Sequence, residues 1–113
     1  MRCCYVEYAA AAHLHQNRAG AGRPDPPDIT SGRIKAETGL ALTTDFHLPE
    51  QAAAVAHVVD LLQVPAFLCR QTDLLIAAGR TGRIVNIKKG QFVSPVDIRH
   101  AADKVASTGN DKI

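Results

Sequence analysis

The stretch from Leu40 to Leu62, LALTTDFHLPEQAAAVAHVVDLL, combines the pattern of a buried strand with that of an amphipathic helix. Residues 40–46 are typical of a buried strand. Pro49 then stands at the first-turn position that proline favours in helices. Apolar residues follow it at helical spacing and predict one buried helix face. These residues are Ala52, Val55, Ala56, Val59 and Leu62.

The same alternation of strand and helix recurs twice further along the chain. We predict strands at 64–68 and 84–88, and helices at 72–78 and 94–109. Pro65 lacks a backbone N–H, so we expect it at one end of its strand. A fourth strand is expected to begin at residues 110–113. Strands that alternate with helices indicate a parallel α/β sheet, here with about three βα units.

The last of these helices has the most clearly marked start. Ser94 is a residue type that caps helix N-termini, and Pro95 stands at the first helical position. Asp97 adds an acid in the first turn, where it complements the helix dipole. We expect the core face of this helix to comprise Ile98, Ala101, Ala102 and Val105.

Residues 1–33 differ in composition from the rest of the chain. They contain three of the six prolines, scattered arginines and no sustained helical or strand period. The alanine run 9–12 could support a turn or two of helix, and 19–28 is typical of a linker. We therefore predict a disordered or irregular segment at 1–33, followed by an α/β unit at 34–113.

The composition argues against several classes of function. The formal net charge is +2 and aromatic residues make up 4% of the chain, which is too little charge and too few rings for a typical nucleic-acid surface. No apolar stretch approaches the roughly 20 residues that span a bilayer. The odd number of cysteines predicts free thiols in a reducing compartment. We expect a cytoplasmic protein that binds neither nucleic acid nor membranes.

Polar clusters flank the predicted strands. Asp45 and His47 follow the first strand, Gln63 and Arg70 flank the second, and residues 88–92 follow the third. In parallel α/β folds, ligands bind at the carboxyl ends of the strands. One acid, one histidine and several cations at a shared rim would suit an anionic, phosphorylated substrate. The spacing therefore favours a phosphate-binding site.

The same clusters also have a purely structural interpretation. A Lys-Lys pair after a strand is usually solvated surface, and an Asp-x-His sequence at a strand end can cap the next helix. Cys69 is expected to be a small buried side chain, since a reactive thiolate needs a depressed pKa and a base partner. We interpret His57 and His100 as surface or packing histidines. Spacing alone leaves both interpretations open.

Three motifs at these clusters resemble those of 3-deoxy-D-manno-octulosonate 8-phosphate (KDO-8-phosphate) synthases. Residues 44–51, TDFHLPEQ, resemble the family's T-D-V-H-E-P-x-Q. Residues 62–74, LQVPAFLCRQTDL, resemble L-Q-I-P-A-F-L-x-R-Q-T-D-L, and residues 86–95, NIKKGQFVSP, resemble N-[IV]-K-K-x-Q-F-[VL]-S-P. The motifs occur in the family's order and at matching separations, so the resemblance covers residues 34–113.

The resemblance implies a partial TIM (β/α)8 barrel. The family condenses phosphoenolpyruvate with arabinose 5-phosphate and releases phosphate, in the biosynthesis of KDO for lipopolysaccharide. Carried over by motif position, the implied substrate-binding residues are Gln63, Ala66, Arg70, Lys88 and Gln91. The implied catalytic residues are Asp45, His47 and Lys88. Asp45, His47 and Gln91 would face the sugar phosphate or the reacting centre.

Several family segments have no counterpart in this sequence. The K-A-N-R-S-S segment that binds both substrates is absent, as is the C-D-R-G segment whose arginine holds phosphate. The full-length family includes members with a divalent metal, but its ligands are not found here. The resemblance therefore implies no cofactor and no metal site in this chain. We expect about three βα units of eight to be inactive alone.

Our main interpretation is a truncated KDO-8-phosphate synthase that binds phosphoenolpyruvate and arabinose 5-phosphate. The resemblance also implies a homo-oligomer, because the full-length family is commonly tetrameric. The alternative is an inactive remnant, or the product of a gene with wrongly assigned limits, that at most associates with full-length subunits. Related barrels that make a seven-carbon phosphosugar acid or a sialic acid share the chemistry. The close match of residues 62–74 counts against them.

Overall fold

The computed structural model describes residues 3–5 and 27–113. The strands are β1 (Cys3–Tyr5), β2 (Ala41–Asp45), β3 (Leu61–Val64) and β4 (Ile84–Ile87). The helices are α2 (Pro27–Thr38), α3 (Gln51–Val58), α4 (Thr72–Arg80) and α5 (Arg99–Ala106), and a 3-10 turn, η1 (Ala66–Leu68), precedes α4.

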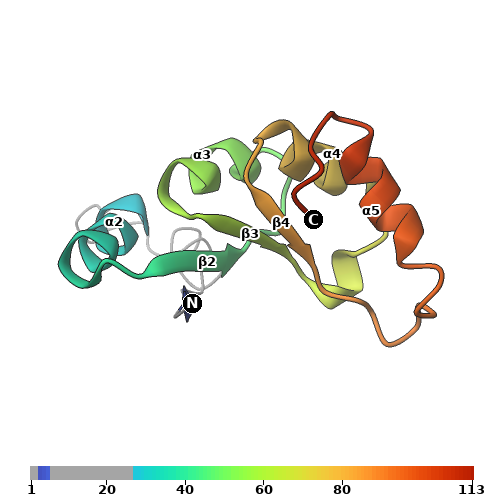
Figure 1. Cartoon of the computed structure of the whole chain (residues 1–113), viewed down its shortest axis with the longest axis horizontal. Coiled ribbons are helices and arrows are strands. Elements are labelled where there is room, and N and C mark those ends of the chain that lie inside the picture. Colours follow the sequence, from blue (N-terminus) through green and yellow to red (C-terminus); the bar gives the residue numbers. More distant parts are fainter. Residues whose placement is uncertain (1–2, 6–26) are drawn as a thin grey trace, which may run out of the picture.

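The described strands form one parallel sheet in the order β1-β2-β3-β4. Consecutive strands are neighbours, and a helix connects β2 to β3 and another connects β3 to β4. In Figure 1, α3 and α4 lie together beside the strands and α5 follows at the end of the molecule opposite α2. This succession confirms the predicted parallel α/β architecture and corresponds to part of a (β/α)8 barrel.

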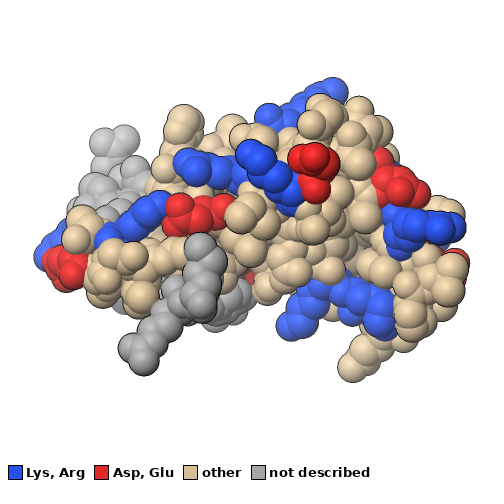
Figure 2. Space-filling model, viewed as in Figure 1, with Lys and Arg blue, Asp and Glu red and all other residues tan. Residues whose placement is uncertain are grey.

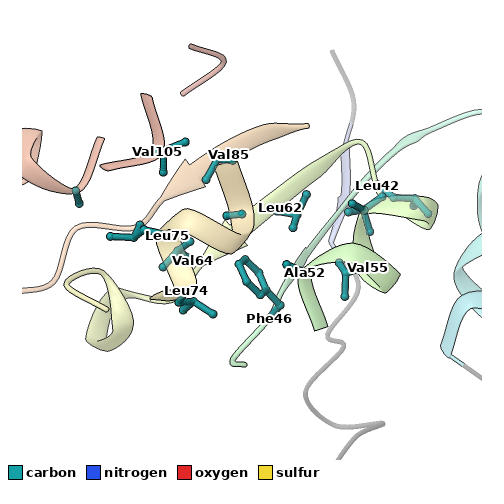
Figure 3. Packing of buried hydrophobic residues seen from close by; sticks show 14 residues of the cluster. Leu42, Phe46, Ala52, Val55, Leu62, Val64, Leu74, Leu75, Val85 and Val105 are labelled. Carbon is teal, nitrogen blue, oxygen red and sulfur yellow. The ribbon is translucent and has the colours of Figure 1, made fainter. Parts of the chain in front are cut away.

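The hydrophobic core lies between the sheet and helices α3, α4 and α5. Leu62 of β3 and Val85 of β4 are register partners and are at most 1% exposed. Leu42 of β2 is also fully buried and lies two residues before Thr44, the β2 partner of Leu62. Phe46 is fully buried, and Figure 3 shows its ring at the centre of the labelled cluster, near Leu74. Because strand side chains alternate between faces, the opposite face of the sheet carries polar residues such as Gln63 and Asn86 together with apolar ones such as Leu61 and Ile84.

The second strand was predicted at 64–68 but lies earlier in the chain, so the predicted position is wrong. β3 is Leu61–Val64, so Leu62 is a strand residue and not the last core residue of the preceding helix. The helix ends at Val58, and Val59 is already extended, with φ −92° and ψ 157°. Pro65 cannot donate to the ladder, so the strand stops before it and residues 66–68 form the 3-10 turn. The expectation that Pro65 lies at one end of its strand is confirmed.

The predicted boundary between residues 33 and 34 falls inside α2. This helix begins at Pro27, a residue tolerated in the first helical turn, and continues to Thr38. Its sequence has no apolar stripe of helical period, so a search for periodicity does not find it. β1 likewise lies in the segment predicted to be irregular and pairs in parallel with β2. Residues 6–26, including the predicted linker from 19, lie outside the described residues.

The third predicted helix starts later than its sequence signals suggest. The Ser94 hydroxyl accepts a hydrogen bond from the Asp97 N–H at 3.1 Å, which is the capping contact that was expected. The residues after it form turns, however, and α5 proper begins at Arg99. Ala101 and Val105 are buried and Ile98 packs against the core, as predicted, whereas Ala102 is only half-buried.

The last residues of the chain run beside β4 without forming a regular strand. The Val85 N–H donates to the Lys112 carbonyl at 2.9 Å (Figure 1, red segment). Asn110, only 6% exposed, anchors this segment. Its Nδ2 donates to the carbonyls of Gly79 at 3.2 Å and Arg83 at 2.8 Å, and its Oδ1 accepts from the Lys112 N–H at 3.1 Å.

A charged contact fixes the amino-terminal ends of β2 and β3. Asp60 Oδ1 accepts from the Lys35 ammonium at 2.6 Å, and Oδ2 accepts from the Leu42 N–H at 3.0 Å. The hydrogen bond from Lys35, followed by that from the Leu42 N–H, lowers the pKa of Asp60 below its ordinary value of 3.8. Arg83, just before β4, makes a further hydrogen bond at this end, because its Nε donates to the carbonyl of Ala56 in α3 at 2.8 Å.

Within the described residues, no helix has the length and apolar character needed to cross a membrane.

Replacing Asp60 by Asn should flatten the acid-induced loss of stability. The pKa of Asp60 is lowered in the folded chain, so its charge stabilises the fold above the unfolded value near 3.8, and this is lost as the pH falls through the lower folded pKa. Urea unfolding in steps between about pH 5 and pH 2 measures this slope. Asp103→Asn, an exposed position in α5, should keep the wild-type slope. A wild-type slope in Asp60→Asn would contradict the prediction.

Replacing Asn110 by Ala should lower the free energy of unfolding by about 1–3 kcal/mol. The substitution leaves the carbonyls of Gly79 and Arg83 without the amide that reaches them and releases the terminal segment from α4. Chemical denaturation at neutral pH gives the measurement. The neighbouring exposed residue provides the control, since Asp111→Ala should change stability by less than about 0.5 kcal/mol. Equal effects of the two variants would show that Asn110 is no anchor.

Candidate functional site

The candidate site residues lie at the carboxyl ends of β2, β3 and β4. Asp45 is the last residue of β2, Gln63 lies within β3 one residue before its end, and Lys88 directly follows β4. These strands are parallel, so their carboxyl ends meet at one edge of the sheet. The Lys88 N–H also donates to the Val64 carbonyl at 3.1 Å, which holds the end of β4 against the end of β3.

Three side chains form a hydrogen-bonded ladder across this edge of the sheet. Asp45, Gln63 and Asn86 are aligned in register on neighbouring strands. Gln63 Nε2 donates to Asp45 Oδ1 at 2.8 Å, and Asn86 Nδ2 donates to Gln63 Oε1 at 2.8 Å. The ladder lies on the face away from the core, because a neighbour of each of these three residues along its own strand is buried, namely Thr44, Leu62 and Val85. It fixes the Gln63 amide with its oxygen toward Asn86 and its nitrogen toward Asp45.

Sequence reasoning did not single out Asn86. Its position two residues before Lys88 carried the necessary signal, because strand residues at this spacing share a face. Val85 and Asn86 confirm the alternation, since Val85 is buried and Asn86 is exposed. Asn86 therefore joins Lys88 on the face that carries the ladder.

His47 lies on the turn that connects β2 to α3. Its backbone N–H donates to Gln51 Oε1 at 2.9 Å, and the Leu48 N–H donates to the same oxygen at 3.0 Å. The side chain that organises this turn is therefore Gln51, the last residue of the first motif. His47 is half-buried and lies two residues beyond Asp45.

Ala66 and Arg70 lie on the segment that connects β3 to α4. Ala66 opens the 3-10 turn, and Cys69 is fully buried beneath it, as expected for a packing thiol. Arg70 is exposed, and its backbone carbonyl accepts from the Lys104 ammonium at 3.4 Å. Lys104 also donates to the Thr72 hydroxyl at 2.7 Å, so α5 holds the start of α4.

Arg70 lines a hollow to which none of the ladder residues contributes. The hollow has a volume of about 400 Å³ and lies between this segment and α5, and its other lining residues include Cys69, Phe92, His100 and Lys104. Within the described part of the chain, Arg70 is the only candidate site residue that lines this hollow. The structure thus brings Asp45 and Gln63 into direct contact, and it places Arg70 on the adjoining segment.

The segment after β4 carries two exposed candidate residues, Lys88 and Gln91. Among the described residues, none forms a hydrogen bond or ion pair with the Lys88 ammonium. Figure 2 shows a group of basic side chains beneath the end of β4, whereas basic and acidic side chains are interspersed elsewhere on this face. An unpaired cation beside a polar ladder can bind phosphate or carboxylate.

Within the described residues, no three His, Cys, Asp or Glu side chains lie together in a way that could hold a metal ion.

The sequence model of the DAHP synthetase I family matches residues 23–113 of this chain. The 2-dehydro-3-deoxyphosphooctonate aldolase of Nitratidesulfovibrio vulgaris (strain DP4) is 63% identical over 81 residues, which cover 72% of this chain and 30% of that protein. The family match starts before residue 34, where the motif resemblance begins, and includes all of α2.

Two further relatives carry the same name. The protein of Syntrophotalea carbinolica is 52% identical over 102 residues, covering 86% of this chain and 37% of its own length. The protein of Brucella ovis is 59% identical over 80 residues, covering 71% of this chain and 29% of its own length. The chain thus spans between 29% and 37% of the length of these three curated relatives.

Replacing Gln63 by Glu should destabilise the fold by about 1–2 kcal/mol at pH 7 and by less at pH 4. The new carboxylate would stand where the Gln63 amide donates to Asp45 Oδ1, so two like charges would meet and one pKa would rise. A raised folded pKa gives a stability contribution that is lost as the pH increases. Urea unfolding at both pH values measures the difference.

The matched control is Gln71→Glu, which makes the same chemical change at an exposed position. It should leave the difference between the two pH values as in the wild type. If Gln63→Glu behaved like this control, the ladder would be absent in solution.

Proposed function

Because the chain belongs to the DAHP synthetase I family, we propose that it carries part of the active site of a KDO-8-phosphate synthase. This enzyme is also named 2-dehydro-3-deoxyphosphooctonate aldolase, the name of the relatives that match residues of this chain at 52–63% identity. The proposed reaction condenses phosphoenolpyruvate with arabinose 5-phosphate and releases inorganic phosphate. The proposed setting is the cytoplasm, in KDO and lipopolysaccharide biosynthesis.

One observation carries this proposal. The unpaired Lys88 ammonium and the ladder of Asp45, Gln63 and Asn86 lie on the same face at the carboxyl ends of neighbouring parallel strands. In barrel enzymes this rim is the part that binds substrate. A cation beside fixed amide groups suits a ligand that has phosphate and carboxylate groups, as phosphoenolpyruvate has.

The roles follow from the chemistry of each group. Lys88, Arg70 and the Gln63 amide would hold the phosphate and carboxylate of phosphoenolpyruvate, with Ala66 forming part of the wall. Asp45, His47 and Gln91 would face the sugar phosphate or the reacting carbons. These groups act by position and charge, so the ladder contributes by fixing the direction of the Gln63 amide before substrate arrives.

In the proposed reaction, negative charge accumulates on the departing phosphate, which Lys88 and Arg70 would bind. Water adds at the central carbon of the enol phosphate, while the neighbouring carbon attacks the aldehyde carbon of the sugar. The aldehyde oxygen takes up one proton of this water and becomes a hydroxyl. The bond between the central carbon and the phosphate oxygen then breaks, the added oxygen becomes the ketone oxygen, and the second proton leaves with the phosphate. Lys88 and Arg70 would offset the negative charge on the phosphate as it leaves.

The alternative proposal is binding without turnover. The described sheet has four strands, with β1 at one edge and β4 at the other, whereas a closed barrel of this class has eight. A chain of this kind would contribute only by associating with full-length subunits, and a homo-oligomer would be the natural setting. The two proposals differ in whether the purified chain releases phosphate.

We expect the purified chain to bind phosphoenolpyruvate saturably, and we expect Lys88→Met and Arg70→Met each to weaken that binding about tenfold or more. Each substitution removes a cation and keeps most of the side-chain length. Isothermal titration measures the affinity, and a phosphate-release assay with arabinose 5-phosphate measures turnover. Absence of turnover with intact binding would favour the alternative proposal.

Lys112→Met is the matched control, because Lys112 lies at the opposite end of β4, where its ammonium donates to the Gly82 carbonyl at 3.1 Å. It should bind phosphoenolpyruvate as the wild type does. An affinity that is unchanged in Lys88→Met and Arg70→Met would contradict the proposed site.

A further inference from the structure

The two adjacent lysines after β4 have different surroundings. Lys88 continues the alternation of the strand on the same face as Asn86, and its ammonium is unpaired among the described residues. Lys89 turns back on its own segment. Its Nζ donates to the Gly90 carbonyl at 3.0 Å and to the Val93 carbonyl at 3.0 Å.

The contacts of Lys89 close a short turn. The Val93 N–H donates to the Gly90 carbonyl at 3.1 Å, so that carbonyl accepts from both Val93 and Lys89. Without the ammonium, this one backbone hydrogen bond would hold the turn. Charge-assisted hydrogen bonds are the stronger kind, and the ammonium makes two of them to the carbonyls of this turn.

The same turn packs against the segment that follows β3. Gly90 is buried, and a Cβ at its position would lie 2.8 Å from the Phe92 ring and 2.9 Å from the Ala66 carbonyl. Glycine is needed here because no side chain fits between the two segments. The turn that Lys89 closes is therefore also the point at which the β4 segment, carrying Lys88 and Gln91, contacts the β3 segment, carrying Ala66.

We propose that Lys89 is a positioning residue that holds residues 88–93 against Ala66, so that Lys88 and Gln91 are presented in a fixed arrangement. A cation on an ordered segment loses less conformational freedom when it binds an anion, and it therefore binds more tightly. The inference rests on the proposed function for the identity of the ligand. The order of the segment itself does not depend on it.

The test uses the full chain and compares Lys89→Met with Lys112→Met, in which another ammonium that donates to a glycine carbonyl is removed. Amide hydrogen exchange of Val93 without ligand reports whether the turn opens. Titration with phosphoenolpyruvate reports affinity, and the unfolding midpoint reports global stability. We expect Lys89→Met to speed Val93 exchange about tenfold and to weaken phosphoenolpyruvate binding several-fold, with an unchanged midpoint.

Lys112→Met should change neither the Val93 exchange nor the affinity, and Lys89→Arg should restore much of both. Unchanged Val93 exchange in Lys89→Met overturns the inference. So does faster exchange with wild-type affinity, because Lys89 would then order the turn without affecting the ligand. If the wild-type chain does not bind phosphoenolpyruvate, the proposed function fails, and the exchange of Val93 alone decides whether Lys89 fixes the segment.

Discussion

Parallel pairing of β2, β3 and β4 in a single register is the constraint on which the rest of the structure depends. It aligns the buried residues Thr44, Leu62 and Val85 on one face. On the other face it aligns Asp45, Gln63 and Asn86. A shift by one residue in any strand would exchange the two faces, burying the polar ladder and exposing the core. The apolar face therefore specifies the register, and the register in turn creates the ladder.

The two ends of the sheet serve different purposes. At the amino-terminal end, Asp60 ties α2 and the start of β2 to the start of β3 through Lys35 and the Leu42 N–H. At the carboxyl-terminal end, Lys88, Arg70 and Gln91 are exposed on connecting segments. This division is usual in barrels, where one rim stabilises the fold and the other carries the chemistry. Under the proposed function, the charged groups of this chain would follow the same division.

The main-chain segments that carry the exposed candidate residues are held by hydrogen bonds from other side chains. Gln51 organises the turn at His47, Lys104 holds the segment at Arg70, and Lys89 closes the turn after Lys88. In each case a long polar side chain reaches back to the main chain, so the candidate residue itself remains available. Supporting contacts of this kind are what a site needs when it acts by position and charge.

The sequence by itself determined the succession of strands and helices, the buried face of β2 and the polar character of the rim. These features depend on local spacing, which alternating apolar residues and Pro65 record directly. Pro49, predicted at the first helical position, lies instead in the turn before α3, which begins at Gln51. The limits of β3, the existence of α2 and the partnership of Asn86 with Gln63 were decided only by the tertiary structure. α2 has no apolar stripe to mark it, and a strand such as β3 is defined by pairing with neighbours distant in the chain. Lys89 bonds to main-chain carbonyls whereas the Lys88 ammonium has no partner among the described residues. This difference depends on where the main chain turns, which residue spacing does not predict.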